Sequence, residues 1–290
     1  MRRLLLLLVA GLLALSAVAC GSDDDAENTG SAGTPTAEPA ADACSPDQLP
    51  LVTAGTLTVG TDKPAYPPYF EDDDPANGKG FESAVAYAIA DQLGLAKDKV
   101  KWTVVPFNAS YAPGPKQFDF DVNQISITPK RQKVVDFSAP YFTAPQALVV
   151  PKGSKLTGAK SLADVRAAKI GVQVGTTSFD AVKEVIKPDT DPKVFNNSTD
   201  VVTALMQGQV EGVVVDLPTA FYVTAAQVEG SKIVGQFEAP GGDKWGALLA
   251  KGSPLTSCVS KAITTLDSSG ELKKIYDQWL GDAAGAPTLS

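Results

Sequence analysis

The stretch "QISITPKRQKVVDFSAPY", Gln124–Tyr141, joins a strand-like apolar run to a basic segment that starts a helix. Thr128 is a favourable N-cap, and Pro129 fits the first helical position because its missing N–H is not needed there. We therefore expect a strand over 120–127 followed directly by a helix over 129–137. A strand that runs straight into a helix is the unit from which α/β folds are built.

The same alternation continues on both sides of this stretch. Residues 56–62 and 100–107 are predicted to be strands, and 80–95 an amphipathic helix. Downstream, the predicted strands are 147–153, 169–175, 193–196 and 210–216, and the predicted helices are 161–168, 176–186, 198–209, 217–228, 255–270 and 271–281. The pattern predicts an α/β protein with mostly parallel sheets.

The chain begins with "MRRLLLLLVAGLLALSAVAC", in which two arginines precede an apolar run that is short for a membrane span. Residues 1–19 are therefore predicted to be a secretory signal peptide. "AVAC" resembles the lipobox of bacterial lipoproteins, which implies a lipid on Cys20 and an extracytoplasmic protein anchored to the cell membrane. The alternative is an ordinary secreted protein in which Cys20 has no such role. Residues 20–45 are acidic and rich in small residues, and are predicted to be a flexible tether.

Composition excludes several classes of function. The formal net charge is −8, and it becomes −10 once Arg2 and Arg3 leave with the signal peptide. An acidic chain without a basic patch is a poor candidate for binding nucleic acid. The chain has no histidine, which removes Ser-His-Asp and Cys-His catalysis and histidine-based zinc sites. "EDDDPANGKG" fails the calcium-loop spacing at Pro75 or Ala76, so we expect no metal and no cofactor.

Two cysteines, Cys44 and Cys258, remain if Cys20 carries the lipid. In an exported protein such a pair favours one disulfide, although two free buried thiols are the alternative. The bridge would tie the end of the folded chain to its beginning. A second lobe would then be inserted into the first, with lobe 1 at 46–143 and 243–285 and lobe 2 at 144–242. Two crossing segments between lobes make a hinge, and a cleft between hinged lobes is a favoured ligand site.

Two strand-to-helix corners have the chemistry of an anion site. Arg131 stands in the first turn of its predicted helix, where helix electrostatics disfavour a cation, and its planar guanidinium suits a carboxylate. In "GVQVGTTSFD" a predicted strand ends at Gly175, and Thr176 opens a helix whose free amides favour an anion. The alternatives are a solvated arginine and a plain threonine-capped helix.

Carboxylates and aromatic rings supply the other candidates. Asp216 ends the predicted strand 210–216, and Asp62 ends the first strand; each is either a cation partner or a helix cap. Tyr66 and Phe107 follow strands and could flank a ligand side chain, although single rings are more often packing residues.

Several motifs occur together in order: "LTVGTD", "NGKGFESAVAYAIADQLGL", "SITPKRQKVVDFSAPYF", "KIGVQVGTTSFD", "ALMQGQVEGVVVD" and "SGELKKIYDQWLG". From about Thr56 to Gly281 the chain resembles the amino-acid-binding, family 3 solute-binding proteins of ABC importers. The resemblance implies the two-lobed periplasmic-binding-protein fold (type II) with a two-segment hinge, which closes on its ligand.

The resemblance also implies a role for each candidate. Arg131, the backbone amide of Ser126 and Thr176, with Gly175 beside it, would bind the α-carboxylate of an amino acid. Asp216 would receive the α-ammonium group. Tyr66 and Phe107 would flank the ligand side chain, and Asp62 would meet its polar end.

Two features depart from the family pattern. A proline-rich loop around Pro113–Pro115 stands where the family has a helix. Gln124 stands where the family often has Gly or Ala, whose carbonyl meets the ammonium group, and the longer side chain is expected to narrow the pocket. Both departures concern the part of the site that selects the ligand.

The sequence thus predicts a monomeric, lipid-anchored protein that traps a free polar amino acid and delivers it to the membrane subunits of an ABC permease. An enzyme on the same fold, such as a cyclohexadienyl dehydratase, and a ligand sensor are the alternatives. Asp62 and the acidic balance favour a ligand side chain with hydrogen-bond donors, such as glutamine, arginine or lysine.

Overall fold

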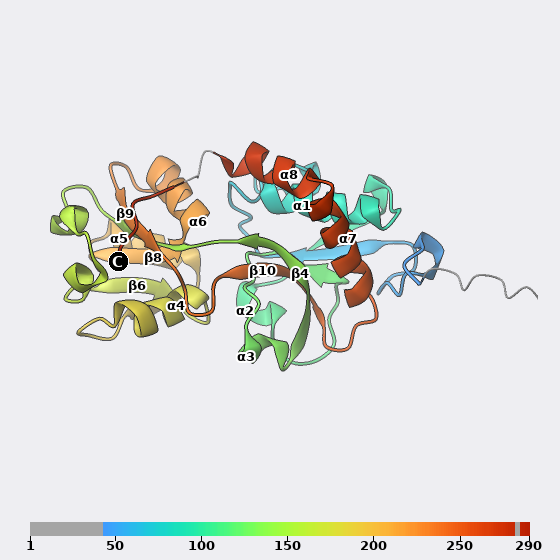
Figure 1. The fold of residues 1–290 in the computed structure, drawn as a ribbon, viewed down its shortest axis with the longest axis horizontal. Coiled ribbons are helices and arrows are strands. Elements are labelled where there is room, and N and C mark those ends of the chain that lie inside the picture. The colour runs from blue at the N-terminus through green and yellow to red at the C-terminus, as the bar shows by residue number, and fades with distance from the viewer. Residues whose placement is uncertain (1–42, 282–284) are drawn as a thin grey trace, which may run out of the picture. The chain divides into compact units, whose positions relative to one another are not determined.

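The computed structural model describes residues 43–281 and 285–290 (Figure 1). The predicted signal peptide 1–19, Cys20 and residues 20–42 of the predicted tether lie outside the described residues. Residues Ala41–Ser290 form one compact unit that contains two five-stranded sheets. In the described part of the chain, no helix combines the length and apolar character that a membrane span needs.

The first sheet has the strand order β2-β1-β3-β10-β4. Strand β1 runs parallel to β2 and β3, whereas β10 runs antiparallel to β3 and β4. The strands are β1 (Leu57–Thr61), β2 (Val100–Val104), β3 (Phe120–Asp121), β4 (Val135–Thr143) and β10 (Lys244–Ala250). The helices of this lobe are α1 (Phe81–Gln92), α2 (Phe107–Ser110), α3 (Pro129–Gln132), α7 (Thr256–Ser268) and α8 (Glu271–Trp279).

The second sheet has the order β7-β6-β8-β5-β9. Strand β6 runs parallel to β7 and β8, and β5 runs antiparallel to β8 and β9. The strands are β5 (Gln146–Val150), β6 (Ile170–Gln173), β7 (Lys193–Phe195), β8 (Gly212–Asp216) and β9 (Lys232–Phe237). The helices are α4 (Thr177–Ala181), α5 (Ser198–Met206) and α6 (Leu217–Tyr222); π-helical turns extend α4 over Val182–Ile186 and α6 over Val223–Gln227.

Short 3-10 turns complete the described chain. They lie at Pro46–Gln48, Pro75–Asn77, Lys97–Lys99, Lys155–Gly158 and Leu162–Val165, the last within the helix predicted over 161–168. The two-lobed α/β class is confirmed, and each sheet is mixed: four of its five strands run in one direction and one strand runs against them. Strands β5 and β10, which follow the two crossings between the sheets, run antiparallel to their neighbours.

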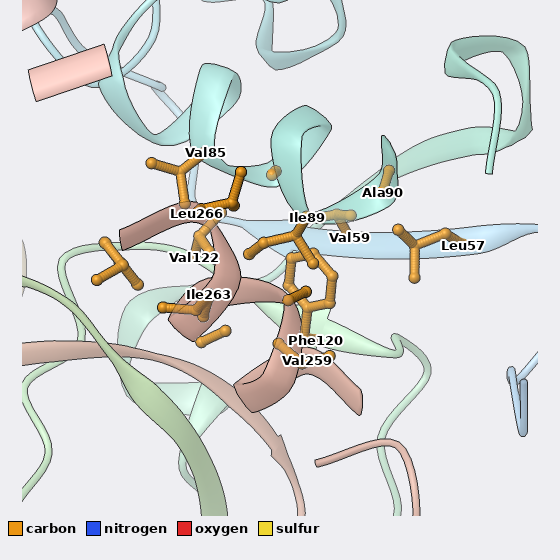
Figure 2. Packing of buried hydrophobic residues seen from close by; sticks show 14 of the residues in the cluster. Leu57, Val59, Val85, Ile89, Ala90, Phe120, Val122, Val259, Ile263 and Leu266 are labelled. Carbon is orange, nitrogen blue, oxygen red and sulfur yellow. The ribbon is translucent and has the colours of Figure 1, made fainter. Parts of the chain in front are cut away.

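The core of the first lobe lies between its sheet and two helices, α1 and α7 (Figure 2). The strands β1 and β3 contribute Leu57, Val59 and Phe120 to this layer. The helices contribute apolar residues at helical spacing: Val85, Ile89, Val259, Ile263 and Leu266. All are almost fully buried. Burying each such side chain contributes about 1.5–3 kcal/mol, so this layer holds the strand ends in place.

The disulfide expected between Cys44 and Cys258 is present, and it joins the start of the described chain to α7. The chain passes from β4 to β5 and later from β9 to β10. A backbone hydrogen bond of 2.9 Å from Ala144 N–H to the Asp243 carbonyl ties these two crossings together. Both connections between the sheets therefore run side by side.

The helix predicted over 129–137 was wrong in length. It ends at Gln132, and Val135 already begins β4. Val135 and Phe137 pair with Ala250 and Leu248 of β10, and Val135 is fully buried. These tertiary pairings outweigh the local preference for a longer helix.

Three further elements were not predicted, and one of them is β10, the antiparallel strand between β3 and β4 in the first sheet. One-turn helix α2 precedes the proline-rich loop, and β9 forms an edge of the second sheet. The C-terminal residues 285–290 lie against that edge: Thr288 forms a parallel bridge with Gln236, and Leu289 is buried in the second lobe's core.

Candidate ligand-binding site

A pocket of about 650 Å³ lies at the strand ends of both sheets. Its wall includes residues that follow β1 and β3 in the first lobe and residues that follow β6, β7 and β8 in the second. Seven of the nine residues predicted to bind ligand line it: Asp62, Tyr66, Phe107, Gln124, Ser126, Thr176 and Asp216. The fold therefore brings together side chains that are as much as 154 positions apart in sequence, from Asp62 to Asp216.

Arg131 and Gly175 lie next to these lining residues and join the two lobes. Arg131 Nη1 donates to the Ser126 carbonyl at 2.7 Å, and Nη2 donates to the Gly175 carbonyl at 2.9 Å. The guanidinium carbon lies 5.4 Å from the Phe107 ring centroid and 4.8 Å from that of Tyr111. A guanidinium carries more donors than these two bonds use, so it can still bind an anion.

The environment of Arg131 explains its position in a helix start. Its side chain is only 6% exposed, and burial lowers its pKa from the usual value. Its backbone N–H is capped by the Thr128 hydroxyl at 3.2 Å, so α3 begins as the sequence predicts. The cation is therefore held by carbonyls and rings of the site rather than by solvent.

The two threonine hydroxyls at the start of α4 have different partners. Thr176 Oγ1 donates to the Gln173 carbonyl at 2.8 Å and accepts from Phe179 N–H at 3.1 Å, which makes it the helix cap. Thr177 Oγ1 instead lies 3.2 Å from Ser126 Oγ, across the two lobes. The predicted contribution of Thr176 must come from its backbone, and Thr177, which follows it, was not among the nine residues predicted to bind ligand.

Asp216 ends β8 and faces the pocket. Its Oδ1 accepts a hydrogen bond of 2.5 Å from Gln146 Nε2. Burial, and after it the charge of Asp243, raises the pKa of Asp216 well above its usual range. Neither Gln146 nor Asp243 was selected from the sequence; both are polar residues beside buried strands at the two crossings.

The remaining lining residues fix the loops of the first lobe. Asp62 accepts from the backbone N–H groups of Lys63 at 2.7 Å and Phe107 at 3.1 Å, so its carboxylate anchors two loops that border the pocket. The Tyr66 hydroxyl lies 2.8 Å from that of Thr199 in the second lobe. Its ring lies 6.1 Å from that of Tyr222, so Tyr66 also helps to join the lobes.

Gln124 has an unusual backbone and a fixed side chain. Its φ of 49° lies in the left-handed region, which disfavours residues with a Cβ. Its N–H donates to Glu82 Oε1 at 2.7 Å, and its side-chain amide donates to Glu82 Oε2. The Tyr141 hydroxyl donates to the same carboxylate at 2.6 Å. Glu82, which the sequence did not single out, therefore holds Gln124 in this strained conformation.

Comparison with known sequences identifies one family. Residues 57–282 match the sequence profile of the family described as "Bacterial extracellular solute-binding proteins, family 3". The match covers both lobes and all nine of the predicted ligand residues.

Curated relatives are similar over most of their length. The L-cystine-binding protein TcyJ of Escherichia coli is 27% identical over 230 residues, which cover 78% of this chain and 83% of that protein. The arginine-binding periplasmic protein of Mannheimia haemolytica is 28% identical, covering 80% of this chain and 94% of that protein. The arginine-binding extracellular protein ArtP of Bacillus subtilis is 26% identical, covering 96% and 98%.

Solved structures agree with these relatives. An ancestral arginine-binding protein bound to arginine is 38% identical with a TM-score of 0.65, over 78% of this chain and 99% of that one. The ancestral amino acid-binding protein AncCDT-1, described as a precursor of cyclohexadienyl dehydratase, is 32% identical with a TM-score of 0.62, over 78% and 95%.

Proposed function

The chain belongs to the bacterial extracellular solute-binding proteins of family 3, and we propose that it traps a polar L-amino acid in the pocket between its lobes. The observation that carries the proposal is a pair of opposite charges: Asp216 lines the pocket, and Arg131 lies directly behind its wall, bonded to the carbonyl of the lining residue Ser126 and to that of Gly175. A free amino acid carries one carboxylate and one ammonium group, and this pair matches both.

Each group of the ligand has a partner in this proposal. Arg131, with the backbone amides of Ser126 and Thr176, binds the carboxylate, while Asp216 receives the ammonium group. Tyr66 and Phe107 flank the ligand side chain, and Asp62 stands at its polar end. Because the partners come from both lobes, the ligand favours the closed state over the open one.

The pocket favours a polar side chain on the ligand. Its second-lobe wall presents amides and hydroxyls, which can both donate and accept: Gln173, Asn196, Asn197, Ser198, Thr199 and Gln227. Proteins similar to this one are named for arginine, cystine and glutamine. We propose a ligand of this kind, with hydrogen-bonding groups beyond the α-carbon.

A ligand screen tests the proposal directly. The twenty common L-amino acids and L-cystine are added to the protein, and the unfolding temperature is measured; a ligand raises it in proportion to the logarithm of its concentration. Calorimetry then gives the affinity for each ligand that raises it. If none binds, the assignment is wrong.

Asp216→Asn and Arg131→Ala test the proposed partners. Each removes a charged partner, so the affinity for the amino acid should fall about tenfold to a hundredfold. Asp136→Asn is the matched control, because Asp136 is bonded to Lys251 and Gly252 on the first sheet, away from the pocket. Arg131→Ala should also lower the free energy of unfolding, since it removes one buried and one partly buried hydrogen bond.

The proposal includes a membrane anchor and a transport partner. A lipid on Cys20 holds the protein to the cell membrane as a monomer, and the closed form delivers its ligand to an ABC permease. Cys20→Ala should release the protein from the membrane fraction of cells that make it. Equal amounts of wild type and variant in the soluble fraction would contradict the anchor, and unchanged amino-acid uptake in cells lacking the protein would favour a sensor.

An enzyme on the same fold is the second candidate. The observation behind it is Glu82, a buried carboxylic acid whose pKa burial raises to about 7, within a lobe similar to a dehydratase precursor. Turnover of prephenate or arogenate by the purified protein would support this candidate. Tight binding of an amino acid without its consumption would count against it.

A further inference from the structure

Two fully buried polar residues occupy the hinge. Gln146 begins β5 directly after the first crossing, and Asp243 stands directly before β10 at the second. Both are 0% exposed. A buried amide and a buried carboxylate at this position need partners, because an unpaired buried polar group is unfavourable.

Their partners connect the two halves of the proposed ligand site. Gln146 Nε2 donates to Asp216 Oδ1 at 2.5 Å and to Asp243 Oδ2 at 2.6 Å. The Thr177 hydroxyl donates to the same Asp243 oxygen at 2.8 Å and lies 3.2 Å from Ser126 Oγ. The bonds form one line, in the order Ser126, Thr177, Asp243, Gln146 and Asp216.

The line orients the carboxylate of Asp216. Both N–H groups of the Gln146 amide are used, one for each carboxylate, so its orientation is determined by its acceptors. Oδ1 of Asp216 is held on the hinge side. Within the described residues no hydrogen bond occupies Oδ2, and Asp216 lines the pocket, so this oxygen is available to a ligand.

The line also concentrates negative charge. Asp216 and Asp243 share one neutral amide, and among the described residues neither forms an ion pair with a lysine or arginine. The charged or titratable groups that face Asp216 are Asp243, Arg131, Glu82 and Tyr69. Arg131 is the cation among them, and its bonds go to two carbonyls. The arrangement therefore has more carboxyl groups than cations, which favours the addition of an ammonium group.

We propose that Gln146 and Asp243 are positioning residues of the ligand site: Gln146 aims the Asp216 carboxylate into the pocket, and Asp243 supplies the second negative charge that selects an ammonium group. The inference rests on the proposed function. Because Gln146 and Asp243 lie at the two crossings, the protein recognises the ammonium group at the place where its lobes are joined.

The test uses two ligand pairs that differ only in the α-ammonium group. L-Arginine is compared with 5-guanidinopentanoate, and L-glutamine with 5-amino-5-oxopentanoate, by calorimetry on the full mature protein. In Asp243→Asn the asparagine carbonyl can still accept from Gln146, so shape is kept and charge is lost. We expect the affinity for the amino acid to fall about tenfold, and the affinity for the analogue to stay within about twofold.

The pH dependence provides a second readout. The ammonium group binds the ionised form of Asp216, so the affinity should fall as the pH drops below the pKa of that carboxyl. Since the charge of Asp243 helps to raise this pKa, Asp243→Asn should move the fall in affinity to lower pH. A purely structural role in the hinge would leave the profile in place.

Two further variants keep the result interpretable. Gln146→Met has a similar volume and should reduce the preference for the amino acid over its analogue even if Asp243→Asn does not fold. Asp136→Asn is the control and should leave both affinities unchanged. Equal losses for both members of a pair, or an unshifted pH profile, would overturn the inference. If the unaltered protein binds no amino acid, the proposed function itself fails, which is a separate result.

Discussion

Glu82 is a fully buried carboxylate in the first turn of α1, and it links ligand-site geometry to pH. It accepts hydrogen bonds from Gln124 and Tyr141, yet burial still raises its pKa from 4.5 to about 7. In the unfolded chain the same carboxyl would lose its proton near its ordinary pKa. Between these two values the folded protein binds more protons than the unfolded chain, so stability falls as pH rises through this range.

Glu82→Gln should reduce this pH dependence of the free energy of unfolding, because glutamine does not titrate. Wild type should lose about 3 kcal/mol of unfolding free energy between pH 4.5 and pH 7 through this group. The glutamine variant should lose less over the same range, although the raised pKa of buried Asp121 leaves part of the slope. Urea unfolding at a series of pH values measures both slopes. The exposed Glu229→Gln is the control, and equal slopes for wild type and Glu82→Gln would refute the assignment.

Gln124 shows what residue-level reasoning could and could not supply. Its departure from the family pattern was visible in the sequence. The hydrogen bonds from Gln124 to Glu82, 42 positions away, could not be predicted, because nothing near either residue specifies the pairing. Arg131 was predictable for the opposite reason, since its conflict with the helix start is a local feature.

At the scale of the elements, the C-terminal tail, residues 285–290, is a segment whose place in the fold the sequence pattern did not indicate. The Gln236 N–H donates to the Pro287 carbonyl at 2.7 Å, and the Leu289 N–H donates to the Gln236 carbonyl at 2.9 Å. Gly235 leaves room for this approach, because a Cβ there would lie 2.6 Å from the Pro287 carbonyl. The tail therefore covers an edge strand that would otherwise expose its hydrogen-bonding groups.

Leu289→Ala tests this role. Leu289 is 3% exposed and packs into the second lobe's core, so the substitution should lower the free energy of unfolding by about 2–4 kcal/mol. Urea unfolding measures the change. Met206→Ala, at an exposed position of the same lobe, should have little effect. Equal effects of the two substitutions would mean that the tail adds no stability.

At the scale of the whole molecule, two tyrosine hydroxyls join the lobes beside the pocket. Tyr66 lies 2.8 Å from the Thr199 hydroxyl, and Tyr69 lies 2.8 Å from that of Thr219. Tyr69 is buried, with its ring edge-on to Trp245 at 5.6 Å. These bonds exist only when the lobes meet, so they favour the closed state.

Tyr69→Phe should destabilise the closed state while the proposed polar partners of the ligand stay in place. Loss of one buried hydrogen bond corresponds to about 1 kcal/mol, so the affinity for the amino acid should fall about fivefold. Small-angle scattering should show a more open protein at subsaturating ligand. Tyr87→Phe is the control, because that hydroxyl donates to Ala76 within the first lobe. An unchanged affinity in Tyr69→Phe would show that the bond does not favour closure.

The sequence by itself determined the features that depend on neighbouring residues. Apolar spacing predicted most strands and helices, Thr128 and Pro129 predicted where α3 begins, and the two cysteines beyond Cys20 predicted the disulfide. Polar residues at strand ends, aromatic residues after strands and the family resemblance together predicted seven of the residues that line the pocket. Apart from the disulfide, which follows from the number of cysteines, and the family resemblance, each of these signals lies within a few positions of the residue it concerns.

Only the tertiary structure decided the features that depend on distant partners. The early end of α3 follows from pairing of β4 with β10, and the buried hinge bond joins Gln146 to Asp243 across 97 positions. The physical reason is that a buried polar group is stabilised by whichever partner the fold places beside it. The sequence shows only that Gln146 and Asp243 are polar. The packing of the two lobes places them together in one site.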